Sequence, residues 1–264
     1  MLRIYTVTCN RPDFIELQLR CFKKQIQEEF EFTVFNNAAF DFDKTEYNNI
    51  NVICNNLNIS VIDVQKEKPL LDAMPQGGPY AAPTALDNYG RYTSANVAHA
   101  YTMCWAWKHF ITKETGPIAI FDSDMFLIQP LAITEMLNCH QLYFIPQGRA
   151  NEQTKIEYVW PGFVLANLST LPDINSVNWW CGKGRGELPL DVGGQTYQYL
   201  EAHPEINICH VWEECILFPP SYYSFISLEG KRIALHYCCA SNWNHLGSEY
   251  HETKTRHIKE QLGI

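Results

Sequence analysis

The sequence lacks the features that mark zinc modules, membrane proteins and nucleic-acid-binding proteins. Its ten cysteines form no C-x-x-C pair and show none of the Cys/His spacings of a zinc module. No apolar run is long enough to cross a bilayer. The 29 acidic residues outnumber the 20 Lys and Arg residues, which gives a net charge of −9. This charge disfavours binding to nucleic acid or anionic lipid, since both need clustered basic side chains.

Internal repeats, low-complexity tracts and linkers are also missing. The 264 residues, 46% apolar and 19% charged, suit one well-packed globular domain over residues 1–264. Met1 leads directly into an apolar strand without a secretory signal, so we expect a cytoplasmic protein. In that reducing compartment the cysteines are expected to be free thiols, most of them buried.

The first half of the chain alternates strands and helices. Short connections between such elements imply parallel strands with right-handed crossovers, which is an α/β fold. A Pro- and Gly-rich segment with no clear period follows at 66–88, and a long helix is then expected over 91–110. The earlier elements are strands at 2–8, 30–35 and 59–64 and helices at 13–27 and 44–56.

The second half is less regular. It contains two further strong apolar segments, at 211–218 and 233–244. The other elements predicted there are a short helix at 133–138, a strand at 141–146, a turn and strand over 158–167 and a helix over 190–200.

The most informative motif is a pair of aspartates, Asp122 and Asp124, that follows the apolar strand starting at Pro117. On an extended chain, residues i and i+2 point to the same side, so both carboxylates can face one divalent ion. Ser123 between them leaves room for a ligand. Mg²⁺ and Mn²⁺ prefer oxygen ligands and use substrate phosphates to complete their shell. The pattern predicts a cation site for a diphosphate; alternatively, Asp122 only caps the next turn and Asp124 is solvated.

Taken with a late histidine at a strand end, these features resemble the GT-A fold of nucleotide-sugar glycosyltransferases. The resemblance implies a Rossmann-like, mixed and mainly parallel central sheet with flanking helices. It also implies that about 1–130 binds the nucleotide sugar and about 131–264 the acceptor. Asp122 and Asp124 would hold Mn²⁺ or Mg²⁺ against the donor diphosphate, with His236 as a further metal ligand. A core histidine bonded to backbone is the alternative for His236.

The resemblance also places a nucleotide, with UDP as the first choice, beyond the ends of the first strands. Its uracil or ribose would meet polar residues there, and Arg91 would reach the diphosphate from the start of the long helix. Turn asparagines and an ordinary surface arginine are the alternatives. The nucleotide-sugar candidates are Thr8, Asn10, Arg11, Asn36, Asn37, Arg91, Asp122 and Ser123.

Acceptor binding is expected on flat tryptophan faces, where sugar C–H groups can pack. The acceptor candidates are Trp160, Gly162, Asn242 and Trp243. An inverting enzyme also needs a carboxylate base, for which Asp191 is the first candidate and Glu213 and Glu214 are the next. Asp191 is equally explained as a helix N-cap, and a retaining enzyme needs no such base. Ser241 to Asn244 follow His236 where retaining glycogenin-like enzymes have Lys-Pro-Trp, so the stereochemistry stays open.

The function that follows is transfer of a sugar from a nucleotide-diphosphate sugar, with UDP-sugars first, to a hydroxyl of a glycan or other acceptor. One alternative is a haloacid dehalogenase-type phosphatase, which also uses an Asp-x-Asp pair but carries it on its first strand. Here the pair follows the fourth expected strand. The other alternative is a sugar-binding module of the same fold without turnover.

Overall fold

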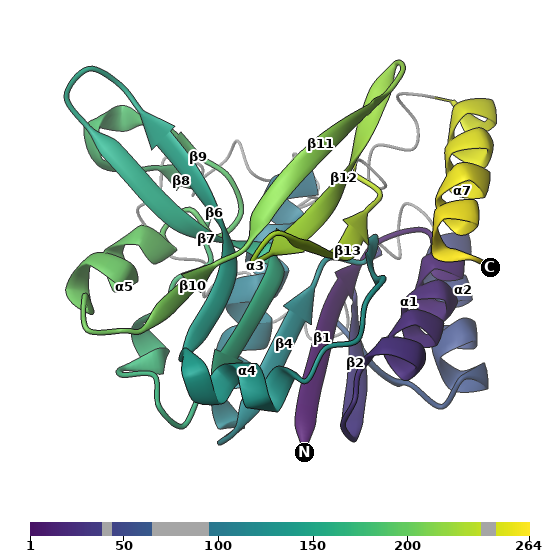
Figure 1. Ribbon diagram of the computed structural model, residues 1–264, viewed down its shortest axis with the longest axis horizontal. Coiled ribbons are helices and arrows are strands. Elements are labelled where there is room, and N and C mark those ends of the chain that lie inside the picture. The colour runs from purple at the N-terminus through teal and green to yellow at the C-terminus, as the bar shows by residue number, and fades with distance from the viewer. Residues whose placement is uncertain (39–43, 65–94, 239–246) are drawn as a thin grey trace.

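The computed structural model describes residues 1–38, 44–64, 95–238 and 247–264 (Figure 1). Its largest feature is a seven-stranded sheet with the strand order β10-β6-β7-β4-β1-β2-β3. Six strands run in the same direction, and β7 is antiparallel to both of its neighbours. The strands are β1 (Leu2–Thr8), β2 (Phe30–Asn36), β3 (Ser60–Asp63), β4 (Pro117–Phe121), β6 (Leu142–Ala150), β7 (Lys155–Asn167) and β10 (Ile208–His210).

The strand order reverses between β1 and β4. The chain adds β2 and β3 on one side of β1, through helices α1 (Pro12–Gln25) and α2 (Lys44–Asn56), and then returns to place β4 on the other side. Open α/β sheets bind ligands at such a reversal, beyond the carboxyl ends of the strands. The residues that follow β1 and β4 therefore border the expected ligand crevice.

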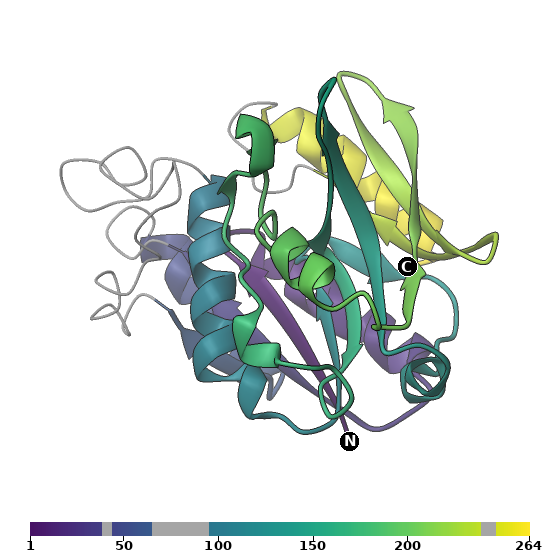
Figure 2. The same ribbon diagram turned by 90° about the vertical axis from the view of Figure 1, so that its left-hand side faces the viewer.

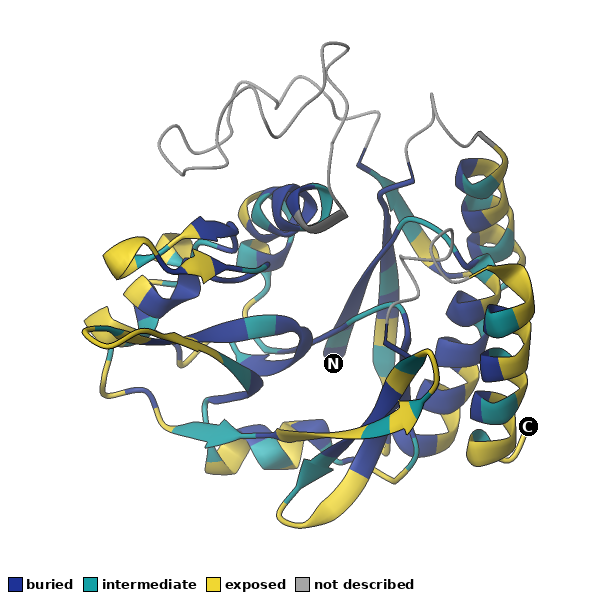
Figure 3. Ribbon diagram, turned by 90° about the horizontal axis from the view of Figure 1, so that it is seen from above, coloured by how far each residue is buried: buried dark blue, intermediate teal, exposed yellow. Residues whose placement is uncertain are grey.

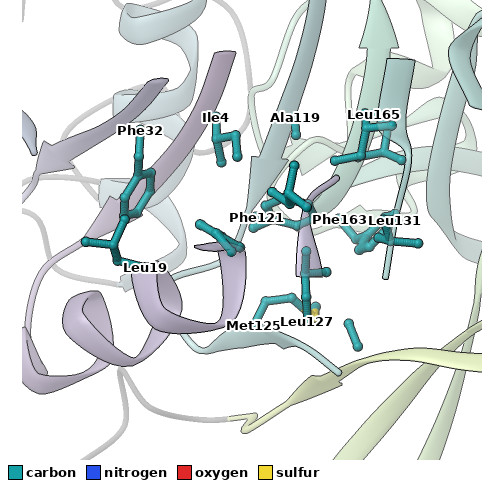
Figure 4. Close-up of a cluster of buried hydrophobic side chains, with 14 of the residues drawn as sticks. Ile4, Leu19, Phe32, Ala119, Phe121, Met125, Leu127, Leu131, Phe163 and Leu165 are labelled. Carbon is teal, nitrogen blue, oxygen red and sulfur yellow. The ribbon is translucent and has the colours of Figure 1, made fainter. Parts of the chain in front are cut away.

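Helices cover both faces of this sheet (Figures 1 and 2). Alternate side chains of β1 enter different cores: Ile4 packs with residues of α1, α2 and α4 (Ile133–Cys139), whereas Val7 packs with α3 (Ala95–His109). Figure 4 shows the first core, in which Phe32 and Phe121 lie around Ile4. Each such side chain contributes about 1.5–3 kcal/mol by leaving water.

A second, antiparallel sheet of four strands has the order β11-β12-β13-β5. It packs against α1 and α7 (Ser248–Leu262), which lie side by side in Figure 1, through a cluster that includes Phe14, Leu235, Tyr237 and Ile258. Exposed residues cover the outer side of α7 (Figure 3). The strands are β5 (Met125–Leu127), β11 (Trp212–Phe218), β12 (Ser221–Leu228) and β13 (Lys231–His236).

The remaining elements are short. Strands β8 (Gly182–Lys183) and β9 (Pro189–Leu190) form a two-stranded sheet, and helix α5 (Thr196–Ala202) follows them. Single 3-10 turns lie at 111–113, 174–176 and 185–187.

The fold class expected from the resemblance, a mixed and mainly parallel sheet with flanking helices, is confirmed. The strand 2–8 and the helix 44–56 have the expected bounds. Helix α1 ends two residues early, because Ile26 adopts an extended conformation while its N–H still bonds Phe22 O. The described part of the long helix, Ala95–His109, lies within 91–110, and the segment 66–88 lies outside the described residues.

Two predictions for the second half need correction. The expected turn within 158–167 is part of one 13-residue strand, β7. Its pairing with β6 shifts between Val164 and Trp160, so that Pro161 and Gly162 form an irregularity within the strand. The helix expected from residue 190 begins only at Thr196, since the residues before it form turns. Strand β12 and helix α7 were not predicted.

Both expected halves contribute to one sheet, since β4 hydrogen-bonds to β7 along its whole length. The nine cysteines that the structure describes are free thiols, as expected. Only four of these nine are buried, fewer than expected: Cys21, Cys54, Cys181 and Cys238. Among the described helices, none has the length and apolar character needed to cross a bilayer.

Candidate active site

Asp122, Ser123 and Asp124 form the connection from β4 to β5, where the chain passes from the seven-stranded sheet to the four-stranded one. The Asp122 N–H donates to Gly162 O on β7 at 2.9 Å, and Met125 N–H donates to Asp122 O at 3.0 Å. From α1, the side-chain amide of Gln18 donates to Asp122 O at 2.7 Å and to Met125 O at 3.1 Å. Three elements therefore fix the motif.

His236 lies beside this motif. It ends β13, which pairs with β5 so that His236 is opposite Met125. The next residue, Tyr237, donates its N–H to Asp124 O at 2.9 Å. The distance from His236 Nε2 to Asp124 Oδ1 is 3.1 Å, and a ligand atom of Asp122 lies within 4.8 Å of both residues' ligand atoms. The structure thus brings together the three residues expected to bind metal.

The donor set suits Mn²⁺ or Mg²⁺. Two carboxylates and a neutral imidazole are acceptable ligands for such ions. An octahedral ion with bonds of about 2.0–2.1 Å separates adjacent ligand atoms by about 3.0 Å. The 3.1 Å between His236 Nε2 and Asp124 Oδ1 agrees with that separation.

The electrostatics of the aspartate pair also favour a cation. Burial, followed by the nearby charge of Asp124, raises the pKa of the Asp122 carboxyl. Asp124 is itself buried, with a side chain 5% exposed. Two carboxylates in this position repel each other, and a divalent ion between them would remove the repulsion.

Glu213 holds the other side of the His236 ring. Its Oε1 lies 3.2 Å from His236 Nδ1 and also accepts a hydrogen bond from Ser224 Oγ. Burial would raise the pKa of Glu213, but the hydrogen bond with His236 lowers it overall. With an ion bound, Nδ1–H would donate to Glu213 and leave the Nε2 lone pair for the metal, which is the tautomer that a metal ligand needs.

Trp160 packs against the same histidine. Its ring centroid lies 5.1 Å from that of His236, with the planes inclined at 47°. A Cβ at Gly162 would lie 2.0 Å from the Trp160 ring, so only glycine at this position leaves room for the ring. Two expected acceptor residues are therefore next to the metal candidates.

Asp191 directly follows β9 and lies beside Tyr158 of β7. Its backbone N–H donates to the Tyr158 hydroxyl at 3.3 Å, and its Oδ1 accepts the N–H of Val192 at 2.8 Å. The turn that it opens lies against β7, because Gly193, with φ of 82°, brings its Cα close to Val159 O. Asp191 does not cap α5, whose N-cap residue is Gln195.

Glu214, the remaining base candidate, is on the exposed side of β11. Arg232 donates to its Oε2 at 2.8 Å and 3.0 Å. The contacts of Glu213 and Glu214 thus give a base role no support, whereas Asp191 lies beside β7, the strand that carries Trp160.

The nucleotide candidates lie at the carboxyl edge of the large sheet. Thr8 and Asn36 are register partners at the ends of β1 and β2, and Asn37 N–H donates to Thr8 O at 2.7 Å. Their side chains shape local turns: Thr8 Oγ1 donates to Asn10 O at 2.8 Å, and Asn36 Oδ1 accepts the N–H of Ala38 at 3.1 Å.

Arg11 is oriented toward the C-terminal helix. Its guanidinium pairs with Asp13 at 2.8 Å, donates to Thr255 at 3.1 Å and lies 3.6 Å from the centre of the Phe14 ring. Ser123 donates its N–H to Asp122 Oδ1 at 2.9 Å. Three further candidates lie outside the described residues: Arg91, Asn242 and Trp243.

Sequence reasoning missed several residues of the site. Cys9 follows β1, and burial together with the charge of Asp122 raises the pKa of its thiol to about 11. Gln18, Ser224 and Cys238 were also not singled out. Their roles depend on contacts between distant segments, for which no local sequence signal exists.

Comparison with known proteins adds little. No protein-family model matches the sequence. No curated protein sequence matches it either. The crystal structure of galactosyltransferase LgtC with donor and acceptor sugar analogues aligns with 80% of this chain and 73% of its own, at 14% identity and a TM-score of 0.41. An active-site mutant of LgtC aligns with 80% of this chain and 72% of its own, at 14% identity and a TM-score of 0.39. Similarities this low carry no argument about activity.

Proposed function

We propose that this protein is a divalent-metal-dependent glycosyltransferase. It transfers a sugar from a nucleotide-diphosphate sugar, with UDP-sugars as the first donors to test, to a hydroxyl of a glycan or another acceptor. The observation that supports this is the convergence of Asp122, Asp124 and His236 at the edge where the strand order reverses between β1 and β4.

In this proposal Asp122, Asp124 and His236 hold Mn²⁺ or Mg²⁺. When bound, the ion supplies positive charge that stabilises the departing diphosphate. Glu213 orients the His236 ring through Nδ1. Asp122 is held in position by its backbone, whose N–H donates to Gly162 O and whose C=O accepts from the side-chain amide of Gln18.

The donor's nucleotide occupies the carboxyl ends of β1 and β2 in this proposal. The residues assigned to it are Thr8, Asn10, Arg11, Asn36, Asn37, Arg91, Asp122 and Ser123. The packing of Arg11 against α7 and the turn contacts of Asn36 favour supporting roles for these two residues.

The acceptor lies against Trp160 and Gly162, with Asn242 and Trp243 as further candidates. Trp160 is partly exposed, so it offers an apolar ring face to sugar C–H groups beside His236. If the reaction inverts, Asp191 is our choice of base.

The position of the aspartate pair in the fold gives less support to a phosphatase. A haloacid dehalogenase-type enzyme carries its nucleophilic Asp after the first strand, whereas this pair follows β4. A sugar-binding module would use the same donor site without turnover, so the distinction rests on activity.

The test is incubation of the full chain with individual UDP-sugars and Mn²⁺, with UDP release as the readout. We expect slow release that stops when the metal is chelated and when Asp124→Asn replaces the wild type. Asp173→Asn, in an exposed turn, is the matched control and should keep full activity. Orthophosphate release from phosphoesters would support the phosphatase instead, and donor binding without UDP release would support the module.

A further inference from the structure

A second group of metal-binding side chains lies on the other side of His236. Glu213 Oε1, His236 Nδ1 and Cys238 Sγ all lie within 4.8 Å of one another. They come from two segments, β11 and the end of β13, which the antiparallel sheet brings together. The donors differ from those at Nε2, since a thiol replaces the two aspartates and thiolates select soft metals such as zinc.

We propose that Glu213, His236 and Cys238 form a regulatory Zn²⁺ site at Nδ1, which shares His236 with the Mn²⁺ or Mg²⁺ site at Nε2. Tetrahedral zinc with a Zn–S bond of about 2.3 Å and Zn–N and Zn–O bonds of about 2.0–2.1 Å separates sulfur from nitrogen by about 3.5 Å and nitrogen from oxygen by about 3.3 Å. The observed distances from His236 Nδ1 are 3.3 Å to Cys238 Sγ and 3.2 Å to Glu213 Oε1. Little movement is needed to form the shell.

The backbone at Cys238 supports a built site. Cys238 is 3% exposed and has a φ of 61°, which is uncommon for a residue other than glycine. This conformation turns its thiol back toward His236. Lys254 of α7 stabilises this backbone conformation, because the Lys254 Nζ donates a hydrogen bond to Cys238 O at 3.0 Å.

The surroundings of the ligands also fit zinc. Ser224 Oγ hydrogen-bonds Glu213 and lies 3.3 Å from Cys238 Sγ, so one hydroxyl orients two ligands. Zinc binding releases the thiol proton of Cys238, and the resulting thiolate and the Glu213 carboxylate balance the two charges of the ion. The Glu213 side chain is 27% exposed, which gives the ion a route from solvent.

Zinc bound at Nδ1 would prevent Nε2 from binding Mn²⁺, a consequence that rests on the proposed function. A neutral imidazole has one N–H and one lone pair. With zinc on Nδ1, the ring proton moves to Nε2 and is donated to Asp124, whose Oδ1 is 3.1 Å away. Nε2 then no longer binds Mn²⁺, so zinc acts as an inhibitor. Linkage requires that Mn²⁺ weakens zinc binding by the same factor.

Cobalt tests the site directly. The full chain is stripped of metal by chelation and titrated with Co²⁺, and thiolate-to-cobalt charge-transfer absorption is recorded in the near ultraviolet. We expect this band in the wild type and in Asp124→Asn, and we expect stoichiometric Zn²⁺ to remove it. Cys238→Ser should lack the band, whereas Cys139→Ser, which removes an exposed thiol of α4, should keep it. Absence of the band in the wild type, or its persistence in Cys238→Ser, would overturn the proposal.

The antagonism has a separate readout. Mn²⁺ affinity is measured by electron paramagnetic resonance with and without saturating Zn²⁺. We expect zinc to weaken Mn²⁺ binding at least about 10-fold in the wild type and to have no effect in Cys238→Ser. Equal Mn²⁺ affinity with and without zinc would overturn the inhibitory role. If no Mn²⁺ binds but the cobalt band appears, the proposed glycosyltransferase site fails while the zinc site stands.

Discussion

The two sheets that meet at Asp124 are covered to different extents. The seven-stranded sheet has a helix-packed core on both faces. The four-stranded sheet packs against α1 and α7 and also joins the first core of the large sheet through Ile226, Ile233 and Ala234. Its edge strand β11, however, leaves Leu217 84% exposed and Trp212 62% exposed. The aspartates thus lie where the chain leaves the enclosed sheet, and His236 ends a strand of the more open one. This difference indicates that the accessible side of the site lies toward β11, where the Glu213 side chain is 27% exposed.

The largest expected effect comes from removing one metal ligand from each sheet. Asp124→Asn should lower Mn²⁺-dependent UDP release at least about 100-fold, because the amide carries no charge for the ion. His236→Ala should lower it by about 10–100-fold. The double variant should be little worse than Asp124→Asn alone, since groups that hold one ion act as a unit.

Kinetics of UDP release at saturating donor give the comparison, and circular dichroism checks that each variant is folded. Fully additive losses would mean that the two sheets do not share an ion.

Lys254 links α7 to the open sheet. It is fully buried, and its Nζ donates to Tyr222 O at 2.6 Å and to Cys238 O at 3.0 Å. Lys254→Met should lower the free energy of unfolding by about 1–3 kcal/mol, because both carbonyls lose a charged donor. The exposed Lys259→Met is the control on the same helix.

Urea denaturation measures the loss, and hydrogen exchange tests where it falls. Amides of β12 and β13 should lose protection while those of β1 and β4 keep theirs. An equal loss in both sheets would show that they unfold as one unit.

Gly162 tests the enclosed sheet where it meets the site. A Cβ there would lie 2.0 Å from the Trp160 ring, so Gly162→Ala should cost about 1–3 kcal/mol of stability. In a Trp160→Ala background the overlap is absent and the cost should disappear. Gly116→Ala, with nothing within 4 Å of its Cβ, is the control for thermal denaturation. A similar penalty at 162 in both backgrounds would contradict the proposed overlap.

The smallest effect is a pH dependence where α7 packs against the open sheet. Burial and the nearby Arg11 and Lys254 charges lower the pKa of His251, whose ring hydrogen-bonds the Tyr237 hydroxyl at 2.7 Å. The unfolded chain therefore binds a proton first, so stability is full above the unfolded pKa of about 6.5 and falls as the pH drops below it.

The urea midpoint of the wild type should be lower below about pH 6.5 than above it. In His251→Gln this decrease in midpoint should be smaller, and a decrease as large as that of the wild type would assign the pH dependence to other groups.

Sequence reasoning was most successful where structure is local. Strand β1 and helix α2 follow from periodicity and short connections. The Asp122 and Asp124 pair was expected on an extended chain, but it lies in a turn closed by the hydrogen bond from Met125 N–H to Asp122 O, and this turn brings the two carboxylates together. His236 was found as a histidine at a strand end, with support from the resemblance. Residues 91–94 and 239–246 lie outside the description, so Arg91, Asn242 and Trp243 stay predictions.

The partners of His236 could not be predicted in this way. Antiparallel pairing in the four-stranded sheet places Ser224 opposite His236 and brings Glu213 to the ring, although no local pattern relates these positions. Gln18 reaches Asp122 across 104 residues of sequence. Pro161 and Gly162 look like a turn in sequence, but the residues on either side pair with β4 and β6, so the two form an irregularity inside a strand.

Strand β5 is three residues long and follows Asp124 without a break. The chain therefore passes from one sheet to the other at the point where a cation would bind. An ion held by Asp124 and His236 would link the two sheets, so metal binding would make their junction more rigid as well as prepare the site for chemistry.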